Sequence, residues 1–346
     1  MKKSNLTAVD LFCGCGSVTL ALRKSKFRVI AAIDNDRVAC RSYRRNHPQV
    51  KLHEGDIRPL DPVHFASNLG QTKIDLLAVC APCQPFSSQN KKRKSRDIRS
   101  DLILESVRFA KALTPRVIFF ENVSGLASPR FRHVLEVLRS DLFALGYELG
   151  LPHKVDAATF GVPQRRVRCI MLAWKKPDDF SKAFNFELSN TCRTVRNAIG
   201  ELPALSSGEI NKDDPLHFAR RHSSLTLERL QKIPKDGGSR FSLPEHLELT
   251  CHKNFKGHPD VYGRMKWDSV APTLTTGCTD VTRGRFAHPV QDRAISLREA
   301  ALLQSFPMSF RFAGNSGEIA RQIGNAVPFE MARQLFNRLR PMLTAG

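Results

Sequence analysis

Short apolar runs alternate with helix-like segments along the first half of the chain. Continuous apolar stretches bounded by turn residues indicate strands buried on both faces, and apolar positions three and four residues apart indicate helices. The predicted strands are 7–12, 28–33, 51–55, a run that begins at Ile74, 117–120 and 167–174. The predicted helices are 18–22, 37–46, 100–113 and 131–145. This alternation predicts an α/β fold with a doubly wound, mostly parallel sheet.

The regular alternation ends after Trp174. Residues 175–266 are rich in Pro, Gly, Asp, His and charge, and they contain few long apolar runs. They predict a second, smaller and irregular β-rich domain. Helical spacing returns at 296–304 and 329–343, and the latter helix is expected to pack on the first domain. The expected domain boundaries are 1–175, 176–312 with a hinge, and 313–346 as a segment returning to the first domain.

Charge narrows the partners of the protein. Lys and Arg total 54 against 33 Asp and Glu, which gives a net charge of +21 and a pI near 10.0. A charge this large favours a polyanionic partner, and nucleic acid is the first candidate. An acidic membrane surface is a weaker candidate, because the sequence has no basic amphipathic helix and no lipidation signal.

The nine cysteines and the N-terminal sequence indicate the compartment. The odd number and irregular spacing of the cysteines are not typical of a disulfide framework. Met1–Lys3 is basic, but Asp10 interrupts the apolar stretch that a signal peptide would need. No run approaches the roughly 18 apolar residues of a membrane helix. We therefore expect a reduced, cytoplasmic protein of bacterial type.

Cys83 stands between Pro82 and Pro85, directly after the apolar run that begins at Ile74. Proline restricts its own backbone and that of the preceding residue, so Cys83 is predicted to lie on a stiff loop. The carboxyl end of a central parallel strand is where ligands bind in such sheets, and a thiol there is a candidate nucleophile. Cys80 and Cys83 also form a CxxC spacing, so a redox pair and an inert core cysteine remain open at this point.

A glycine-containing turn follows the first predicted strand at 13–16 and leads into a helix. Glycine lets the backbone approach a ligand closely. Asp34 ends the second strand 18 residues after Gly16, and Asp56 ends the third strand. An acid at about that distance is typical of ribose binding. The six-residue dinucleotide fingerprint is absent, so an adenosine compound other than a nicotinamide cofactor is expected.

Six ordered motifs resemble those of the DNA (cytosine-5) methyltransferase family of the bacterial restriction-modification type. The motifs are 10–16, 82–87, 121–123, 163–168, 271–276 together with 298–299 and 303–307, and 324–328. The resemblance covers most of the chain outside about 176–262. Ser17 stands where the family usually has a second glycine, and the loop after Ser87 lacks its usual glycine.

The resemblance implies a Rossmann-like methyltransferase fold and transfer of a methyl group to carbon 5 of cytosine in a specific duplex DNA sequence. It implies that Cys83 adds covalently to carbon 6 of the cytosine. It also implies that Glu121 holds the proton on ring nitrogen 3. Arg166 and Arg168, predicted on one side of the last strand, are assigned to the cytosine oxygen and nearby phosphates. The base must leave the helical stack to be reached, so base flipping is expected.

The family also implies S-adenosylmethionine as the cofactor, no metal, and a monomer acting on double-stranded DNA. The pocket residues carried over from its motifs are Phe12, Gly14, Gly16, Asp34, Asp56, Ile57, Pro82, Leu102, Asn325 and Val327. The basic run 91–96 is expected to contact phosphates, against the alternative of a solvated loop. A transfer RNA cytosine methyltransferase of the same fold and a non-catalytic basic binding protein are the competing readings. The first lacks its Cys-Phe-Thr signature here, and intact Cys83 and Glu121 argue against the second.

Overall fold

The computed structural model describes residues 6–70, 72–82, 102–181, 183, 193–249 and 259–345. The chain divides into two compact units. Unit 1 comprises Met1–Ala157, Val167–Leu188 and Phe329–Gly346, and unit 2 comprises Ala158–Arg166 and Ser189–Pro328. These bounds differ from those expected at 175 and 312. Segment 158–166 joins unit 2 because Arg165 N–H donates to Ala271 O at 2.8 Å, and 313–328 joins it because helix α9 (Ser316–Asn325) packs on α8 (Leu297–Leu303).

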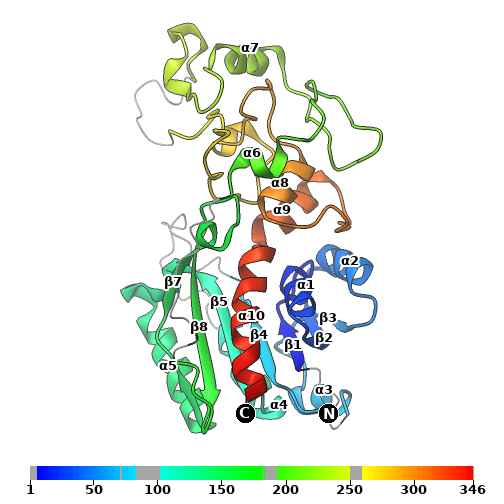
Figure 1. The fold of residues 1–346 in the computed structure, drawn as a ribbon, viewed down its shortest axis with the longest axis vertical. Coiled ribbons are helices and arrows are strands. Elements are labelled where there is room, and N and C mark those ends of the chain that lie inside the picture. The colour runs from blue at the N-terminus through cyan, green and yellow to red at the C-terminus, as the bar shows by residue number, and fades with distance from the viewer. Residues whose placement is uncertain are drawn as a thin grey trace. The chain divides into compact units, whose positions relative to one another are not determined.

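Unit 1 is built on an eight-stranded sheet in the order β3-β2-β1-β4-β5-β8-β6, with β7 also paired to β8 (Figure 1). The strands are β1 (Thr7–Leu11), β2 (Arg28–Asp34), β3 (Lys51–Glu54), β4 (Leu76–Val79), β5 (Val117–Val123), β6 (Tyr147–Leu149), β7 (His153–Asp156) and β8 (Val167–Lys175). Strands β1 to β5 are parallel, whereas β6 and β7 pair with β8, and β8 with β5, in antiparallel fashion. The predicted α/β class with a mostly parallel sheet is confirmed.

Helices cover the sheet of unit 1. They are α1 (Ser17–Lys24), α2 (Arg37–Asn46), α3 (Pro62–Ser67), α4 (Glu105–Leu113), α5 (Arg132–Ala144) and α10 (Phe329–Ala345). In Figure 1, α10 (red) runs along the sheet beside α1. The ring of Phe336 on α10 lies 5.0 Å, centroid to centroid, from Phe119 of β5 and 6.3 Å from Phe27. Aromatic packing of this kind buries a large apolar area and fixes α10 against the sheet.

The local sequence accounts for where the long elements begin and end. The Asp36 side chain accepts hydrogen bonds from the N–H groups of Val38 and Ala39, and so caps the start of α2. His47 and Pro48 end that helix, as the sequence predicted. In unit 1 the predictions missed α3, β6 and β7, because elements of three to six residues are too short to show a clear period. In unit 2 they also missed the longer helix α9.

Unit 2 carries helices α6 (Val195–Ile199), α7 (Ser224–Lys232), α8 and α9, joined by long irregular segments. Unit 2 also contains the short 3-10 helices η6 (Arg240–Ser242), η7 (Glu245–Leu247) and η9 (Val281–Arg283). Two further 3-10 helices, η3 (Ser124–Ala127) and η4 (Pro129–Phe131), lie in unit 1, and η5 (Ala157–Phe160) lies where unit 1 passes into unit 2. We expected a β-rich second domain, but its described residues form only isolated β-bridges, such as Arg264 with Ala287. Frequent Pro and Gly and the absence of period-two alternation explain why no ladder extends further there.

A buried arginine joins several irregular segments of unit 2. The side chain of Arg264 is 0% exposed. Its guanidinium donates to the backbone carbonyls of Leu230, Ile233, His288 and Gln291 at 2.7–3.2 Å, and it pairs with Asp292. The planar, five-donor guanidinium suits this task, because buried carbonyls without a partner are costly. Arg264 therefore replaces part of the hydrogen bonding that a sheet would supply.

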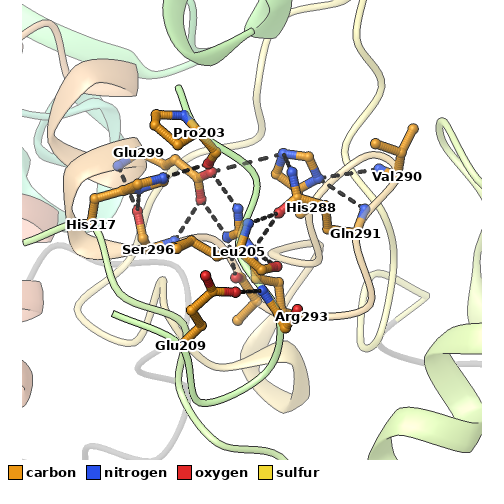
Figure 2. Close-up of polar contacts among 12 residues, drawn as sticks. Pro203, Leu205, Glu209, His217, His288, Val290, Gln291, Arg293, Ser296 and Glu299 are labelled. Carbon is orange, nitrogen blue, oxygen red and sulfur yellow. Dashed lines mark hydrogen bonds and ion pairs between the residues drawn. The ribbon is translucent and has the colours of Figure 1, made fainter. Parts of the chain in front are cut away.

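A second buried arginine, Arg293, forms a two-bond ion pair with Glu299 of α8 (Figure 2). The Nη–Oε distances are 2.8 and 2.7 Å, and the two side chains are 0% and 1% exposed. Glu299 also accepts from Ser296 N–H, while Ser296 Oγ accepts from Glu299 N–H, which closes a capping box at the start of α8. His217 accepts at Nδ1 from Ser296 Oγ and donates at Nε2 to Pro203 O. This network ties α8 to the segment before α7.

Candidate active site

The carboxyl ends of β1 to β5 meet at one edge of the sheet in unit 1, because these strands are parallel. Val79, the last residue of β4, is in register with Leu11 of β1 and with Phe120 of β5. Glu121 follows Phe120 directly, so its backbone stands at the level where β4 gives way to the loop that leads to Cys83. Cys83 itself lies outside the described residues.

A hydrogen bond joins this loop to β5 just before Cys83. The Asn122 side-chain N–H donates to Ala81 O at 3.2 Å, and both residues are buried. Ala81 precedes Cys83 by two positions, with the exposed Pro82 between them. Asn122 therefore fixes the start of the loop beside Glu121. The sequence analysis included Asn122 in the motif 121–123, but it did not predict the hydrogen bond to Ala81 O.

Glu121 is paired with Arg168 across the sheet. Strand β8 runs antiparallel to β5 and places Arg168 opposite Val123. Arg168 Nε lies 3.0 Å from Glu121 Oε1, and the two side chains are 11% and 8% exposed. A carboxylate this deeply buried requires a charged or hydrogen-bonding partner. The structure thus brings together two of the residues that the sequence predicted, at the edge where the loop to Cys83 begins.

Cys80 differs chemically from a reactive cysteine. Burial, together with the nearby charges of Glu121 and Asp10, raises the pKa of the Cys80 thiol well above its usual value. A thiol with a raised pKa stays protonated at neutral pH and is a poor nucleophile. Cys80 therefore fits the role of a small apolar residue at the end of β4 better than that of a nucleophile.

Arg166 serves a different purpose from Arg168, which corrects the expectation that they share one side of a strand. Strand β8 begins at Val167, and Arg166 belongs to unit 2. Its guanidinium donates to Leu274 O at 2.9 Å and to Gly324 O at 2.7 Å, and the residue is 3% exposed. Arg166 thus ties together the segments around 274 and 324, so its observed role is structural.

Gln164 performs a similar function two residues earlier. Its Oε1 accepts from Leu274 N–H at 3.0 Å, and its Nε2 donates to Leu303 O at 3.2 Å. A Cβ on Gly324 would lie 2.5 Å from the Thr275 backbone, so only glycine fits where α9 meets this segment. Several motifs that the sequence analysis singled out therefore converge inside unit 2 as one packed junction.

The glycine-containing turn after β1 has a strained and specific shape. Phe12, Gly14 and Gly16 have positive φ values of 60°, 54° and 98°. Such values are unusual for a bulky residue like Phe12, and they mark a backbone held by its surroundings. Asp34 at the end of β2 accepts from Gly14 N–H at 2.8 Å, and burial raises the pKa of its carboxyl. Asp34 therefore contacts the turn at Gly14, and the use of this turn by a cofactor stays a prediction.

Asp56 has a partner that the sequence analysis did not consider. Arg58, two residues later, donates to both carboxylate oxygens of Asp56 through its side chain and to Oδ1 through its N–H. These hydrogen bonds lower the pKa of Asp56 and keep it ionised. Ile57 between them is 3% exposed and packs in the core of unit 1. Asp56 is thus held in place beside the strand edge by its own loop.

The remaining predicted pocket residues are divided between the units. Leu102 is half-buried against the core of unit 1. Asn325 and Val327 belong to unit 2, where Asn325 ends α9 and is exposed while Val327 is buried. The basic run 91–96 lies outside the described residues.

Two residues behind the glycine turn, Tyr43 and His47, were not predicted to matter. They lie on and directly after α2, four residues apart, and their rings meet edge to face at 4.8 Å. Their spacing was visible in the sequence, but it indicated only one face of a helix. The residues that they contact appear only in the folded chain.

Among the described residues, no three His, Cys, Asp or Glu side chains form a group that could hold a metal ion. Within the same residues, no helix has both the length and the apolar character needed to cross a membrane.

Known proteins resemble this chain over nearly its full length. It is 36% identical to the Type II methylase M.HgiDII of Herpetosiphon aurantiacus, covering 97% of this chain and 95% of that protein. It is 30% identical to the Type II methyltransferase M.Eco47II of Escherichia coli, over 94% and 76% of the two chains. The solved structure of a prophage-encoded E. coli protein has a TM-score of 0.79 at 23% identity, covering 98% and 99%. The S. pombe Dnmt2 methyltransferase has a TM-score of 0.65 at 18% identity, covering 97% and 98%.

These solved structures are too distant in sequence to show more than the fold, which agrees with the sheet of unit 1. The family described as C-5 cytosine-specific DNA methylase matches residues 6–340, which include every predicted motif. Together with the identity to Type II methylases, this match shows that the chain belongs to the C-5 cytosine-specific DNA methylase family, the enzymes that methylate carbon 5 of cytosine in DNA.

Proposed function

We propose that the protein transfers a methyl group from S-adenosylmethionine to carbon 5 of a flipped-out cytosine in a specific duplex DNA sequence, through a covalent adduct with Cys83. The observation that carries this proposal is the buried ion pair between Glu121 and Arg168, 3.0 Å long, at the edge of the sheet where Asn122 holds the loop to Cys83. A carboxyl group and a guanidinium at the sheet edge where the loop to Cys83 begins suit a planar, polar base.

Cytosine carbon 5 is a poor nucleophile, and the chain has the groups needed to activate it. The Cys83 thiolate adds to carbon 6, the electron pair of the 5,6 double bond shifts to the bond between carbons 4 and 5, and the pair of the double bond between carbon 4 and nitrogen 3 moves onto nitrogen 3. Glu121 holds a proton at nitrogen 3, which offsets the negative charge that develops there. Arg168 orients Glu121 and provides a donor for the carbonyl oxygen. After methylation, a base removes the carbon 5 proton, the double bond forms again, and Cys83 leaves as thiolate.

The turn after β1 fits an adenosine-containing methyl donor. Among the described residues, no atom would lie within 4 Å of a Cβ placed on Gly14, which leaves room for a ligand on this side of the turn. The neighbouring Asp34 carboxylate accepts one N–H at each oxygen, from Gly14 and Asp36, and each oxygen keeps a lone pair for a ribose hydroxyl. When bound, S-adenosylmethionine supplies the methyl group. The residues proposed to hold it are Phe12, Gly14, Gly16, Asp34, Asp56, Ile57, Pro82, Leu102, Asn325 and Val327.

The Asp34→Ala variant tests this pocket. Loss of the carboxylate removes both the ribose acceptor and the support of Gly14, so the dissociation constant for S-adenosylmethionine should rise about tenfold or more. Binding of duplex DNA should stay within about twofold, because phosphate contacts dominate that affinity. Calorimetric titration with the donor measures the first, and an unchanged donor affinity contradicts the pocket assignment.

We propose further that recognition of the DNA sequence resides in the 176–312 region, most of which lies in unit 2. His, Arg, Asn and Ser side chains of this region are able to read base edges in the major groove. Exchange of Ser189–Pro328 as one piece with the matching piece of a relative should transfer site preference, because these bounds follow a compact unit. Sequencing of methylated DNA reads the outcome. A site preference that stays with the segments of unit 1 contradicts the assignment.

The covalent step is tested with duplex DNA that carries 5-fluorocytosine at the target site. Fluorine cannot leave as a cation, so Cys83 cannot be released after methyl transfer and the enzyme stays bonded to the DNA. Mass spectrometry of the digested complex should find the oligonucleotide on the peptide that contains Cys83, only when methyl donor is present. Cys80→Ser is the matched control and should still form the adduct, whereas Cys83→Ser should not.

Three outcomes decide between the proposal and its competitors. An adduct at Cys80, or one that persists in Cys83→Ser, contradicts the assigned nucleophile. An adduct on fluorinated transfer RNA and none on duplex DNA identifies the RNA enzyme of the same fold. Donor-independent DNA binding without any adduct or methylation identifies a non-catalytic binding protein.

A further inference from the structure

The turn between β1 and α1 is held from behind by α2. Gly16 closes the turn in the left-handed region with φ 98°, and its N–H donates to Cys13 O at 2.9 Å. A Cβ on Gly16 would lie 2.5 Å from the imidazole of His47 and 3.0 Å from the ring of Tyr43. The two rings therefore lie directly against the turn. A Cβ on Gly14, by contrast, would meet no atom of the described residues within 4 Å.

His47 is fixed in one tautomer by its two partners. Its Nε2 lies 2.9 Å from Gly16 O, and a carbonyl only accepts, so Nε2 carries the proton and donates. Its Nδ1 accepts from Arg23 Nη1 at 3.1 Å. The residue is 1% exposed, and burial lowers its pKa to about 4, so the ring is neutral at physiological pH. His47 is thus a neutral donor aimed at the carbonyl that also starts α1.

Tyr43 reaches the end of β1 through one hydroxyl. Its OH lies 2.8 Å from Thr19 Oγ1, and Thr19 Oγ1 lies 2.7 Å from Asp10 Oδ2. All three residues are 0% exposed. Thr19 Oγ1 donates its proton to Asp10 Oδ2, so its oxygen is left to accept from Tyr43 OH. Asp10 Oδ1 is buried and has no hydrogen-bond partner among the described residues, so Thr19 is the side chain that orients this carboxylate.

We propose that Tyr43 and His47 are positioning residues for the methyl donor: they hold the turn 13–16 and the Asp10 carboxylate in the arrangement to which the donor binds. The inference rests on the proposed use of this turn by S-adenosylmethionine. Helix α2 carries no proposed pocket residue, but through Tyr43 and His47 it influences the affinity of the pocket for the donor.

The experiment compares two tyrosines that each make one buried hydrogen bond in unit 1. Tyr147 OH donates to Pro115 O at 2.7 Å, and Tyr147 is 1% exposed, so Tyr147→Phe removes a bond of the same kind away from the turn. Both Tyr43→Phe and Tyr147→Phe should lower the melting temperature slightly and to a similar extent. Only Tyr43→Phe should raise the dissociation constant for S-adenosylmethionine, by about five- to tenfold, since one hydrogen bond is at stake.

A second pair of variants tests His47 without depending on Tyr43. His47→Gln keeps an N–H donor within reach of Gly16 O, whereas His47→Leu keeps the volume and removes the donor. His47→Leu should weaken donor binding about tenfold, and His47→Gln should recover most of that loss. In steady-state assays, both His47→Leu and Tyr43→Phe should raise KM for the donor and leave kcat at saturating donor nearly unchanged, because the reacting groups stay in place.

The outcomes separate this inference from the function on which it rests. If wild-type protein binds the donor but Tyr43→Phe and Tyr147→Phe have equal donor affinities, the positioning role is wrong and the proposed function stands. Equal loss in His47→Gln and His47→Leu likewise overturns the role of the His47 donor. If wild-type protein does not bind S-adenosylmethionine at all, the proposed function itself fails.

Discussion

The two units of this protein solve the same problem, the burial of backbone polar groups, by different means. Every named strand among the described residues belongs to unit 1, where the backbone groups of neighbouring strands bond to one another and side chains such as Leu77 and Phe120 fill an apolar core. The described residues of unit 2 form isolated bridges in place of ladders. Its largest fully buried side chains are Arg264 and Arg293, each of which serves carbonyl groups from separate loops.

The difference shows what an irregular region needs in order to be a stable fold. Loop carbonyls taken out of water must find donors, and a guanidinium supplies five of them in a rigid plane. Leu230 and Ile233, whose carbonyls accept hydrogen bonds from Arg264, belong to the buried apolar cluster of unit 2, so water is kept away from these bonds. A framework built from a few such side chains leaves the loops between them free to vary in sequence. That property suits a region proposed to read different DNA sites.

The largest effect is expected from Arg293→Met. The change leaves the Glu299 carboxylate, 1% exposed, without its ion-pair partner, and this should lower the free energy of unfolding of unit 2 by about 3–5 kcal/mol. Adding Glu299→Gln removes the unpaired charge and keeps the capping geometry, so it should recover about half of the loss. Hydrogen exchange resolved by peptide measures each unit separately. A loss of less than about 1 kcal/mol would show that the ion pair does not support unit 2.

The second largest effect is expected from acid, which should lower the stability of unit 2 more than that of unit 1. His288 Nδ1 accepts from Gln291 N–H and His222 Nε2 from Ala294 N–H, and burial lowers the pKa of His222 and brings that of His288 to about 4. The unfolded chain binds these protons near pH 6.5, so their stabilisation is complete above that pH and is lost as pH falls towards 4. The loss for unit 2 should be on the order of 2 kcal/mol between pH 6.5 and 4.5.

Unit 1 should respond less to acid, because two of its groups oppose each other. His47 behaves like His288, with a pKa lowered to about 4 by burial. Burial raises the pKa of Asp10 to about 7, so the folded state binds this proton first, and acidification from pH 7 to 4 relieves the cost of its buried charge. Hydrogen exchange at several pH values compares the units. Equal slopes in both units, or an unchanged unit 2 slope in His288→Gln, would contradict this reading.

Phe119→Leu is expected to destabilise unit 1 more than unit 2, by a smaller amount than the changes described above. Phe119 is 0% exposed and lies against Phe336 of α10, so the substitution leaves a small cavity and should cost unit 1 about 1–2 kcal/mol. Exchange in unit 2 peptides should change far less than exchange in β5 and α10. A larger loss in unit 2 than in unit 1 would mean that the two cores are not separate.

The smallest effect is expected at the surface of unit 2. Arg196 pairs with Asp268 at 2.7 Å, but the side chains are 53% and 64% exposed. Water and salt screen such a pair, so Arg196→Gln should leave the unfolding midpoint in denaturant unchanged within error. A loss comparable to that of Arg293→Met would show that charge pairing in general, rather than buried arginine, holds unit 2 together.

The sequence predicted those parts of the protein that follow from regular local patterns. Strands such as β1 and β5 are long apolar runs, and parallel order alone brought Glu121 to the edge beside the loop to Cys83. The same logic placed Asp34 next to the Gly14 turn. Here, local pattern and global fold agree, so inference from the sequence is reliable.

The sequence could not predict contacts that depend on which distant loops meet. Charged residues are usually exposed, so nothing in the pattern marks Arg264 as a buried donor to four carbonyls. Arg166 and Arg168 look equivalent two residues apart, yet one binds carbonyls of unit 2 and the other pairs with Glu121. Tyr43 shows the same limit, because its role depends on a hydroxyl reaching Thr19 from another helix.

The order of the units along the chain has a consequence for how the protein is made. Unit 1 needs α10, which covers α1 and the ring of Phe119, but the ribosome makes all of Ser189–Pro328 before α10 emerges. Until then, the nascent sheet has an uncovered apolar face, which is a target for chaperones and proteases. A chain that terminates before α10 is therefore expected to be degraded rather than to accumulate, so a cell would contain mainly complete copies of the enzyme.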